Sequence, residues 1–197
     1  SLLDCETIDK AFNFNKIKTI LEIGAGSGRT SEAIMTINNN LNYVICDIPT
    51  AIYISYSRLK IAFPNKKISL LIDINDKDEL QKNIKSNDIS FIFPHQLKTI
   101  DKKFFNFVLA IDCLHEMDNK TIKYYFDLIN DLTNNFYFSI WSKTIVPYTK
   151  TFFNSGQRLD FIKNDYNIPK NWECIFKENS IFPSNFLNLG YKIKRSN

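Results

Sequence analysis

Hydrophobic runs and amphipathic stretches alternate along most of this chain. Short apolar runs predict strands, and the stretches between them carry apolar residues at helical spacing. The predicted core strands are 19–23, 42–46, 89–93, 105–111 and 135–141, and the predicted helices are 30–37, 50–63, 77–85 and 119–132. This alternation is typical of a doubly wound α/β domain with a mostly parallel sheet. The run 135–141 has few polar residues, as a central parallel strand requires.

Two regions decide how many strands the sheet has. Residues 67–73 and 89–93 are both strand-like, and we favour the later run as the third core strand because the short gap that follows it is typical of that position. Residues 68–87 are then an insertion. Near the end of the chain, 172–177 and 186–194 predict a closing antiparallel hairpin. We therefore predict a Rossmann-like, mostly parallel seven-stranded sheet that ends in this hairpin.

The most informative segment follows the first predicted strand. Three glycines at alternate positions, Gly24, Gly26 and Gly28, separate that strand from the next helix. Glycine allows positive φ and a close backbone approach, so this turn can place bare backbone against a nucleotide-like ligand. A dinucleotide site would need a third glycine where this chain has Arg29. Glu22, just before the turn, favours a cationic ligand that lacks phosphate.

Composition limits the classes of protein that remain. The chain has 197 residues, 44% hydrophobic and 14% aromatic, which predicts one globular domain over residues 1–197. The net charge is +4 and the lysines are scattered, which disfavours nucleic acid as a partner. No run has the length of a membrane span, and the first residues given do not show the pattern of a signal peptide. The four cysteines are far apart, which disfavours a disulfide framework or zinc and makes a cytoplasmic protein the simplest expectation.

The glycine turn resembles motif I of the class I S-adenosylmethionine (SAM) methyltransferases. In that family the loop wraps the methionine end of the cofactor, which implies that SAM contacts Glu22 and the residues of the turn. The turn residues concerned are Gly24, Ala25, Gly26 and Gly28. The resemblance also implies that Asp112 is the motif IV acid and that it lies, with Cys113, near the methionine part of SAM. The alternative is a chance glycine turn in another α/β protein.

Further cofactor contacts are expected after the second and third core strands. Asp47 lies 19 residues after Gly28, and its carboxylate can accept hydrogen bonds from both ribose hydroxyls. Alternatively, Asp47 caps the helix that follows. Ile48 would pack on the adenine, and His95 or Gln96 could supply a polar contact to the adenine edge. A plain surface turn at 93–96 is the alternative for these last two residues.

The end of the fourth core strand holds the candidates for catalysis. Ligands of open α/β sheets collect at the carboxyl ends of the strands, where Asp112, His115 and Glu116 fall. Methyl transfer to a hydroxyl requires a base to remove the proton, and an imidazole ionises near neutral pH. His115 is therefore the candidate base, and Glu116 could orient the imidazole or take the proton itself. Alternatively, these residues only cap the next helix.

Two short motifs narrow the resemblance. The Asp-Ile-Pro of 47–49 and the His-Glu-Met of 115–117 are similar to a sugar O-methyltransferase family in which the corresponding strands end in Asp-Leu-Pro and in a Glu-Met pair. This resemblance covers about 20–141, and more weakly 172–194. It implies a hydroxyl of a sugar or glycan precursor as the acceptor. Because the first strand begins so soon after Ser1, we also expect an N-terminal substrate-binding region that this chain lacks.

The acceptor side and metal dependence are less well marked. Residues 142–160 are polar with interspersed aromatics, which suits either a loop over a sugar acceptor or an ordinary surface loop. Asp112 and Glu116 could contribute to a divalent metal site. However, no second acid stands at the end of the fifth strand, where 141–143 reads Trp-Ser-Lys. We therefore expect no metal.

Other classes of function remain as alternatives. A SAM-binding scaffold without catalysis would keep the same cofactor motifs, and so would a methyltransferase for another small molecule. Arg29 disfavours a nicotinamide-dependent oxidoreductase. A nucleic-acid methyltransferase is disfavoured because no Asn-Pro-Pro-Tyr motif follows the fourth strand. The expected partner is a small-molecule or sugar acceptor, and the sequence leaves a homo-oligomer open.

Overall fold

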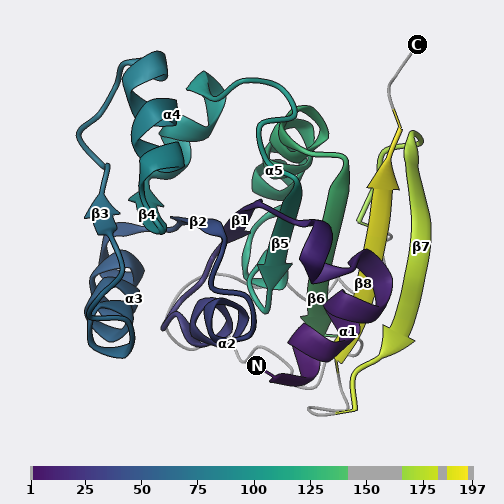
Figure 1. Cartoon of the computed structure of the whole chain (residues 1–197). Helices are drawn as coiled ribbons and strands as arrows, with labels where there is room; N and C mark the ends of the chain where they lie inside the picture. Colours follow the sequence, from purple (N-terminus) through teal and green to yellow (C-terminus); the bar gives the residue numbers. More distant parts are fainter. Residues whose placement is uncertain (1, 142–165, 182–185, 195–197) are drawn as a thin grey trace, which may run out of the picture.

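The computed structural model describes residues 2–141, 166–181 and 186–194. Within these residues the chain forms an eight-stranded sheet with the order β3-β4-β2-β1-β5-β6-β8-β7 (Figure 1). The strands are β1 (Thr19–Ile23), β2 (Asn42–Cys46), β3 (Ile68–Leu70), β4 (Ile89–Ile92), β5 (Phe107–Ile111), β6 (Asn135–Trp141), β7 (Trp172–Asn179) and β8 (Phe186–Ile193).

The sheet is parallel from β3 to β6, and β8 and β7 close it as an antiparallel hairpin. From β1 the chain builds outward through β2 to β4 and β3, and it then returns to place β5 on the other side of β1. This reversal makes the carboxyl ends of β1 and β5 a topological switch point, where loops diverge and leave a crevice. Both candidate motifs, the glycine turn and Asp112, follow these two strands.

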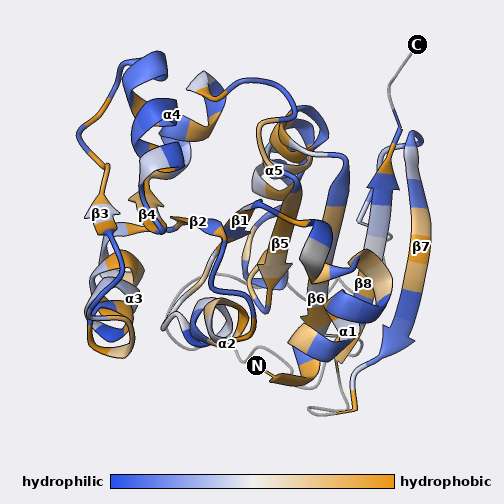
Figure 2. Ribbon diagram, in the orientation of Figure 1, coloured by the Kyte–Doolittle hydropathy of each residue, from blue (hydrophilic) through white to orange (hydrophobic). Residues whose placement is uncertain are grey.

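Helices cover both faces of the sheet. The helices are α1 (Leu2–Phe12), α2 (Arg29–Ile37), α3 (Pro49–Ala62), α4 (Lys77–Ser86) and α5 (Asn119–Leu132), with short 3-10 turns η1 (Phe14–Lys16), η2 (Pro94–Thr99) and η3 (Leu114–Glu116). One hydrophobic core joins α1, α2 and α3 to the sheet, and the other joins α4 and α5 to the opposite face. Figure 2 shows β5 in hydrophobic colours and α4 largely hydrophilic, as expected for a buried strand and a surface helix.

Local sequence explains where several helices begin. The side chains of Asp76 and Asp118 each accept a hydrogen bond from a backbone N–H in the first turn of α4 and α5. Pro49 occupies the first turn of α3, where its missing N–H costs nothing. By contrast, the N-cap residue of α2 is Gly28, which supplies no side-chain cap. The start of α2 is therefore left open on the side of the glycine turn.

The predicted fold class is confirmed: a mostly parallel, Rossmann-like sheet ends in an antiparallel hairpin. The run 89–93 is the core strand next to β2, as favoured from the sequence. The expected count of seven strands is one too few, because residues 68–70 pair with β4 and extend the sheet. The expected acceptor loop at 142–160 lies outside the described residues.

Candidate functional site

The glycine turn adopts the left-handed backbone that its sequence predicts. Gly24, Gly26 and Gly28 have φ of 71°, 56° and 74°. A Cβ on Gly24 would lie 2.7 Å from Cβ of Cys113, so only glycine fits between the ends of β1 and β5. A Cβ on Gly28 would lie 3.1 Å from Cβ of Ser55 on α3. These two glycines therefore let the turn pack closely against its neighbours.

Gly26 differs from the other two glycines of the turn. A Cβ built on Gly26 would meet nothing within 4 Å, although the residue lines a cavity of the protein. Its backbone N–H donates to Oδ2 of Asp47 at 2.9 Å. The turn thus presents open space on its cavity side and is tied to the end of β2 on the other. This is the cradle that a closely bound ligand would fill.

Glu22 is a buried carboxyl group beneath the turn, 2% exposed. Its Oε2 accepts hydrogen bonds from the hydroxyls of Ser31 on α2 and Tyr43 on β2. Burial raises the pKa of Glu22 from 4.5 to about 7, although the two hydrogen bonds oppose the shift. Glu22 therefore joins β1, β2 and α2 and can change its charge near neutral pH.

Asp47 lies at the carboxyl end of β2, beside the turn. Its carboxylate accepts hydrogen bonds from the backbone N–H of Gly26 and of Ile48, and burial raises its pKa from the ordinary value. The side chain of Ile48 is 61% exposed. A carboxylate oxygen can accept more than one hydrogen bond, so Asp47 can still accept from a diol.

At the end of β5 the chain turns sharply through Asp112, whose φ is +57°. Aspartate tolerates this left-handed conformation better than most residues, and the turn leaves its side chain 53% exposed. Nε2 of His115 lies 3.3 Å from Oδ1 of Asp112, and the imidazole is 5% exposed. The Cys113 thiol donates to the carbonyl of Ile23 at 3.2 Å, and burial raises its pKa well above the usual range.

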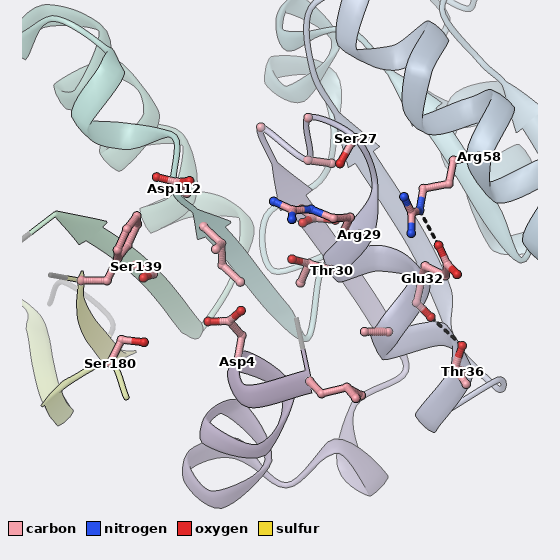
Figure 3. A pocket seen from close by; sticks show the side chains of 18 residues that line it. Asp4, Ser27, Arg29, Thr30, Glu32, Thr36, Arg58, Asp112, Ser139 and Ser180 are labelled. Atoms are coloured by element: carbon pink, nitrogen blue, oxygen red, sulfur yellow. Dashed lines mark hydrogen bonds and ion pairs between the residues drawn. The ribbon is translucent and has the colours of Figure 1, made fainter. Parts of the chain in front are cut away.

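A cavity of about 620 Å³ opens at the switch point, within the range of small-molecule sites. One wall is the glycine turn and the adjoining face of α2, and the other comes from α1 and the ends of the strands beyond β1. The second wall carries Asp4, Ile111, Asp112, Ser139, Ser180 and Phe186. Figure 3 shows Asp4 at the start of α1 and Asp112 at the end of β5, both on this side.

The charges of the cavity are arranged unevenly. Arg58 of α3 forms an ion pair with Glu32 of α2. Arg29, the first residue of α2, also lines the cavity, and its side chain makes no hydrogen bond or ion pair with the part of the chain that the structure describes. The opposite wall bears the acids Asp4 and Asp112. The cavity can thus hold a ligand that carries both signs of charge.

The structure brings some of the expected site residues together and separates others. Glu22, Gly24, Ala25, Gly26 and Asp112 line the cavity, while Asp47, Gly28 and Cys113 support it from behind. The remaining expected residues lie outside its lining.

Gln96, a candidate for a polar contact to the adenine edge, is buried and not at the surface. It is 1% exposed, accepts from the N–H of Phe93, and donates to the carbonyls of Leu71 and Ile74. Its whole amide is used to tie the loops around η2, so a contact from Gln96 to adenine does not fit this placement. His95 is exposed, with its ring 6.1 Å from that of Phe93.

Of the two residues expected to act in catalysis, only His115 lies close to the cavity wall. Its ring centroid is 6.2 Å from that of Phe186, which lines the cavity, and its Nε2 faces Asp112. Glu116 is exposed and lies outside the lining of the cavity. The expectation that Glu116 removes a proton therefore does not fit this geometry.

Several lining residues were not singled out from the sequence. Asp4, Ser139 and Ser180 come from three distant segments, and only the fold brings them to one cavity. Arg29 was noted as a departure from a dinucleotide motif, but its position directly after the glycine turn also signals a side chain at the cavity. The sequence alone therefore carried a signal that could have identified Arg29 as a residue of the cavity.

The described residues contain neither a metal cluster nor a membrane-spanning helix. No group of three or more His, Cys, Asp or Glu side chains there is placed to hold a metal ion. No helix in that part of the chain is long and apolar enough to cross a membrane.

Comparison of sequences identifies no family for this chain, whereas comparison of structures identifies its fold. No protein-family model matches the chain, and no curated protein matches it. The methyltransferase domain of bacterial CtHen1-CN superposes with a TM-score of 0.62 at 13% identity, over 98% of this chain and all (100%) of that one. The mitomycin 7-O-methyltransferase MmcR superposes with a TM-score of 0.60 at 11% identity, over 98% of this chain.

A third similar structure is 1,6-didemethyltoxoflavin-N1-methyltransferase of Burkholderia thailandensis, which contains S-adenosylhomocysteine (SAH). It superposes with a TM-score of 0.58 at 12% identity, and the match covers 99% of this chain and 79% of that one. The chain spans 54% of MmcR and 54% of the pyocyanin biosynthetic protein PhzM, about half of each. The chain therefore shares the Rossmann-like fold of these methyltransferase structures.

Proposed function

We propose that this protein is a SAM-dependent methyltransferase that acts on a hydroxyl group of a sugar or glycan precursor. The observation that carries the proposal is the cavity at the switch point, which is lined by a glycine turn on one side and by the acids Asp4 and Asp112 on the other. The similar structures include O- and N-methyltransferases of small molecules, and one of them contains SAH.

The residues around the turn fit the parts of SAM. Gly24, Ala25 and Gly26 offer backbone and open space to the methionine end. Asp47 offers carboxylate oxygens to the ribose hydroxyls, and the exposed side chain of Ile48 offers an apolar surface to the adenine. His95, exposed after β4, is the remaining candidate for the adenine edge. When bound, SAM would supply an electrophilic methyl group on a sulfonium.

The acceptor side of the cavity is rich in hydrogen-bonding groups. Ser139 and Ser180 line it beside Asp112. Asn188 lies directly opposite Ser139 in the β6–β8 pair and is 3% exposed, and its Oδ1 has no hydrogen-bond partner within the described residues. A buried amide oxygen without a partner is costly, and side chains opposite each other on paired strands share one face. This polar wall suits a polyhydroxylated acceptor better than a flat aromatic one.

Proton removal is assigned to the pair formed by Asp112 and His115. The Asp112 carboxylate reaches the cavity, and the imidazole lies behind it at 3.3 Å. In the proposed reaction the acceptor hydroxyl gives its proton to this pair as its oxygen takes the methyl group. The protein's other contribution is alignment of the two reactants, which can supply much of the rate.

Calorimetric titration tests the cofactor half of the proposal. We expect the wild-type protein to bind SAM and SAH and to show no binding of NAD. Asp47→Ala should lower the affinity for SAH at least tenfold, because the ribose then loses charge-assisted hydrogen bonds of about 1.5–3 kcal/mol each. Failure of the wild type to bind SAM and SAH would overturn the proposal.

The acceptor half is tested separately, with methyl-labelled SAM and two panels of acceptors. One panel contains free sugars and nucleotide sugars, and the other contains catechols and nitrogen heterocycles. Transfer to the first panel alone is expected. Transfer to the second panel alone would favour a methyltransferase of another small molecule, as the N1-methyltransferase with a similar fold is. SAM binding without transfer to any acceptor would favour a non-catalytic SAM-binding domain.

A further inference from the structure

Arg29 lines the cavity, and its side chain has no partner there among the described residues. It is the first residue of α2, directly after the last glycine of the turn, and it is exposed and lines the cavity. Figure 3 shows its guanidinium pointing from the start of α2 into the space between the turn and Asp112. A guanidinium has five N–H donors, and in a site they are usually matched by carboxylate or phosphate.

The second arginine of the cavity provides a useful contrast. Arg58 lies on α3 and forms an ion pair with Glu32, so its charge is already balanced within the protein. Arg29 has no such carboxylate within the part of the chain described. Of the two cations, Arg29 is therefore the one available to a ligand.

The position of Arg29 is also unfavourable for the free protein. The N-terminus of a helix carries a partial positive charge, which disfavours a cation in the first turn. Gly28, the residue before it, provides no side-chain cap that would offset this effect. A residue that weakens its own helix and points into a cavity is more readily explained by ligand binding than by stability.

The charge pattern of the cavity defines the ligand group. On the side of the glycine turn and α2, Arg58 is paired with Glu32, and Arg29 is the cation without a carboxylate partner among the described residues; the opposite wall carries Asp4 and Asp112. The methionine end of SAM or SAH carries a carboxylate and an ammonium group on one carbon. We propose that Arg29 binds this carboxylate while the ammonium faces the acidic wall. This inference rests on the proposed function, and it assigns to Arg29 the recognition of the amino-acid end of the cofactor.

The test compares two ligands that differ only in this carboxylate. SAH and its decarboxylated analogue, 5′-deoxy-5′-(3-aminopropylthio)adenosine, are titrated calorimetrically into the wild type and into Arg29→Gln. The wild type should bind SAH about 10- to 100-fold more tightly than the analogue, the usual scale for a charge-assisted, bidentate contact. In Arg29→Gln most of this preference should be lost, while the affinity for the analogue should change less than about threefold, because that ligand never made the contact.

Two controls separate this role from a structural one. Arg58→Gln should leave the preference for SAH over the analogue unchanged. Arg29→Gln, without ligand, should unfold at the same temperature as the wild type or at a higher one, since it removes a cation from the helix N-terminus. A lower unfolding temperature together with equal loss of affinity for both ligands would overturn the assignment.

The remaining outcomes are also distinguishable. If Arg29→Gln binds SAH as tightly as the wild type does, the assignment is wrong, even if turnover with an anionic acceptor falls. If the wild type binds neither SAH nor SAM, the proposed function fails and the assignment fails with it. Binding of SAH to the wild type with an unchanged preference in the variant would reject the role of Arg29 alone.

Discussion

Glu22 is a carboxyl group that the fold holds away from water, and its ionisation affects the stability of the whole domain. Burial raises the pKa from 4.5 to about 7. Between these two values the group is protonated in the folded state and ionised in the unfolded state, so unfolding releases a proton. The contribution of Glu22 to stability is therefore fully present below pH 4.5 and is lost as the pH rises through 7.

A pH series of unfolding measurements checks this effect. Glu22→Gln keeps the size of the side chain and can still accept hydrogen bonds from Ser31 and Tyr43, but it does not titrate. From pH 4.5 to 7.5 we expect the free energy of unfolding of the wild type to fall relative to this variant by about 3 kcal/mol, from about 1.4 kcal/mol for each unit of pKa. A constant difference between the two proteins across this range would contradict the raised pKa.

Substitutions at Asp112 and His115 should lower turnover while cofactor binding changes little. Asp112→Asn should lower kcat by about 10²–10⁴-fold, the usual scale for loss of a general base. Asparagine also tolerates the positive φ at this position, so the unfolding temperature should change little. His115→Gln should lower kcat and alter its pH profile while the Kd for SAH stays near that of the wild type. Unchanged turnover in both variants, measured with an acceptor found by screening, would reject the pair.

At the scale of an element, the two sides of the glycine turn have different surroundings: one packs against the protein, and the other faces the cavity. Gly24 faces Cys113, where an added Cβ would clash at 2.7 Å, whereas a Cβ on Gly26 would meet no protein atom within 4 Å. Both residues have positive φ, so an alanine at either position carries a similar backbone strain, about 1–3 kcal/mol. The two substitutions therefore differ chiefly in what the new methyl group touches.

This difference yields a matched pair of variants. Gly24→Ala should lower the unfolding temperature more than Gly26→Ala, because it adds a steric clash to the shared strain. Gly26→Ala should bind SAH at least tenfold more weakly than the wild type, since its methyl group occupies the cradle of the ligand. Measurement of both quantities on both variants is decisive. Equal unfolding temperatures together with normal binding by Gly26→Ala would show that the turn does not contact the ligand.

The strands were the most predictable elements of this chain. The ranges 19–23, 42–46 and 135–141 coincide with β1, β2 and β6, because each is an apolar run bounded by polar residues or glycine. Strands of a parallel sheet that is covered on both faces are buried on both sides, so they are visible in the sequence as nearly continuous apolar runs. The short strand at 68–70 was harder to assign, since a three-residue edge strand leaves little pattern.

The site was predictable only where one motif carries it. The glycines, Glu22 and Asp112 follow recognisable strands, and the topology brings them to one cavity. Gln96 was placed wrongly because its partners, Leu71 and Ile74, lie more than twenty residues upstream. Asp4, Ser139 and Ser180 could not have been grouped from local pattern, because they reach the cavity from α1, from β6 and from the C-terminal hairpin.

At the scale of the whole molecule, α1 is a structural part of the site as well as of the core. Its residues Cys5 and Ile8 are 1% and 0% exposed, and the ring of Phe12 lies 4.8 Å from that of Phe107 on β5. The same helix sends Leu2 and Asp4 to the wall of the cavity. Packing of α1 on the sheet therefore fixes the geometry of a wall that lies far from the glycine turn in sequence.

We expect Ile8→Ala to lower both stability and ligand affinity. Loss of a fully buried isoleucine side chain costs about 2–5 kcal/mol, and a loosened α1 should weaken SAH binding because Leu2 and Asp4 shift with it. Unfolding by denaturant and calorimetric titration check the two effects. Lys10→Ala, on the exposed side of α1, removes only a surface ion pair with Glu6 and should change neither quantity measurably.

The two borders of the sheet have a consequence for how this protein behaves at high concentration. An unpaired strand edge is a template on which another chain can add, and such addition leads to aggregation. Strand β7 forms the long border, and there the exposed charges of Glu173, Lys177 and Glu178 and an irregular register between Cys174 and Phe176 disfavour a new partner. The other border, β3, is only three residues long. Neither border offers a long, flat, apolar edge, so within the described residues the sheet gives fibril growth by strand addition no ready starting point.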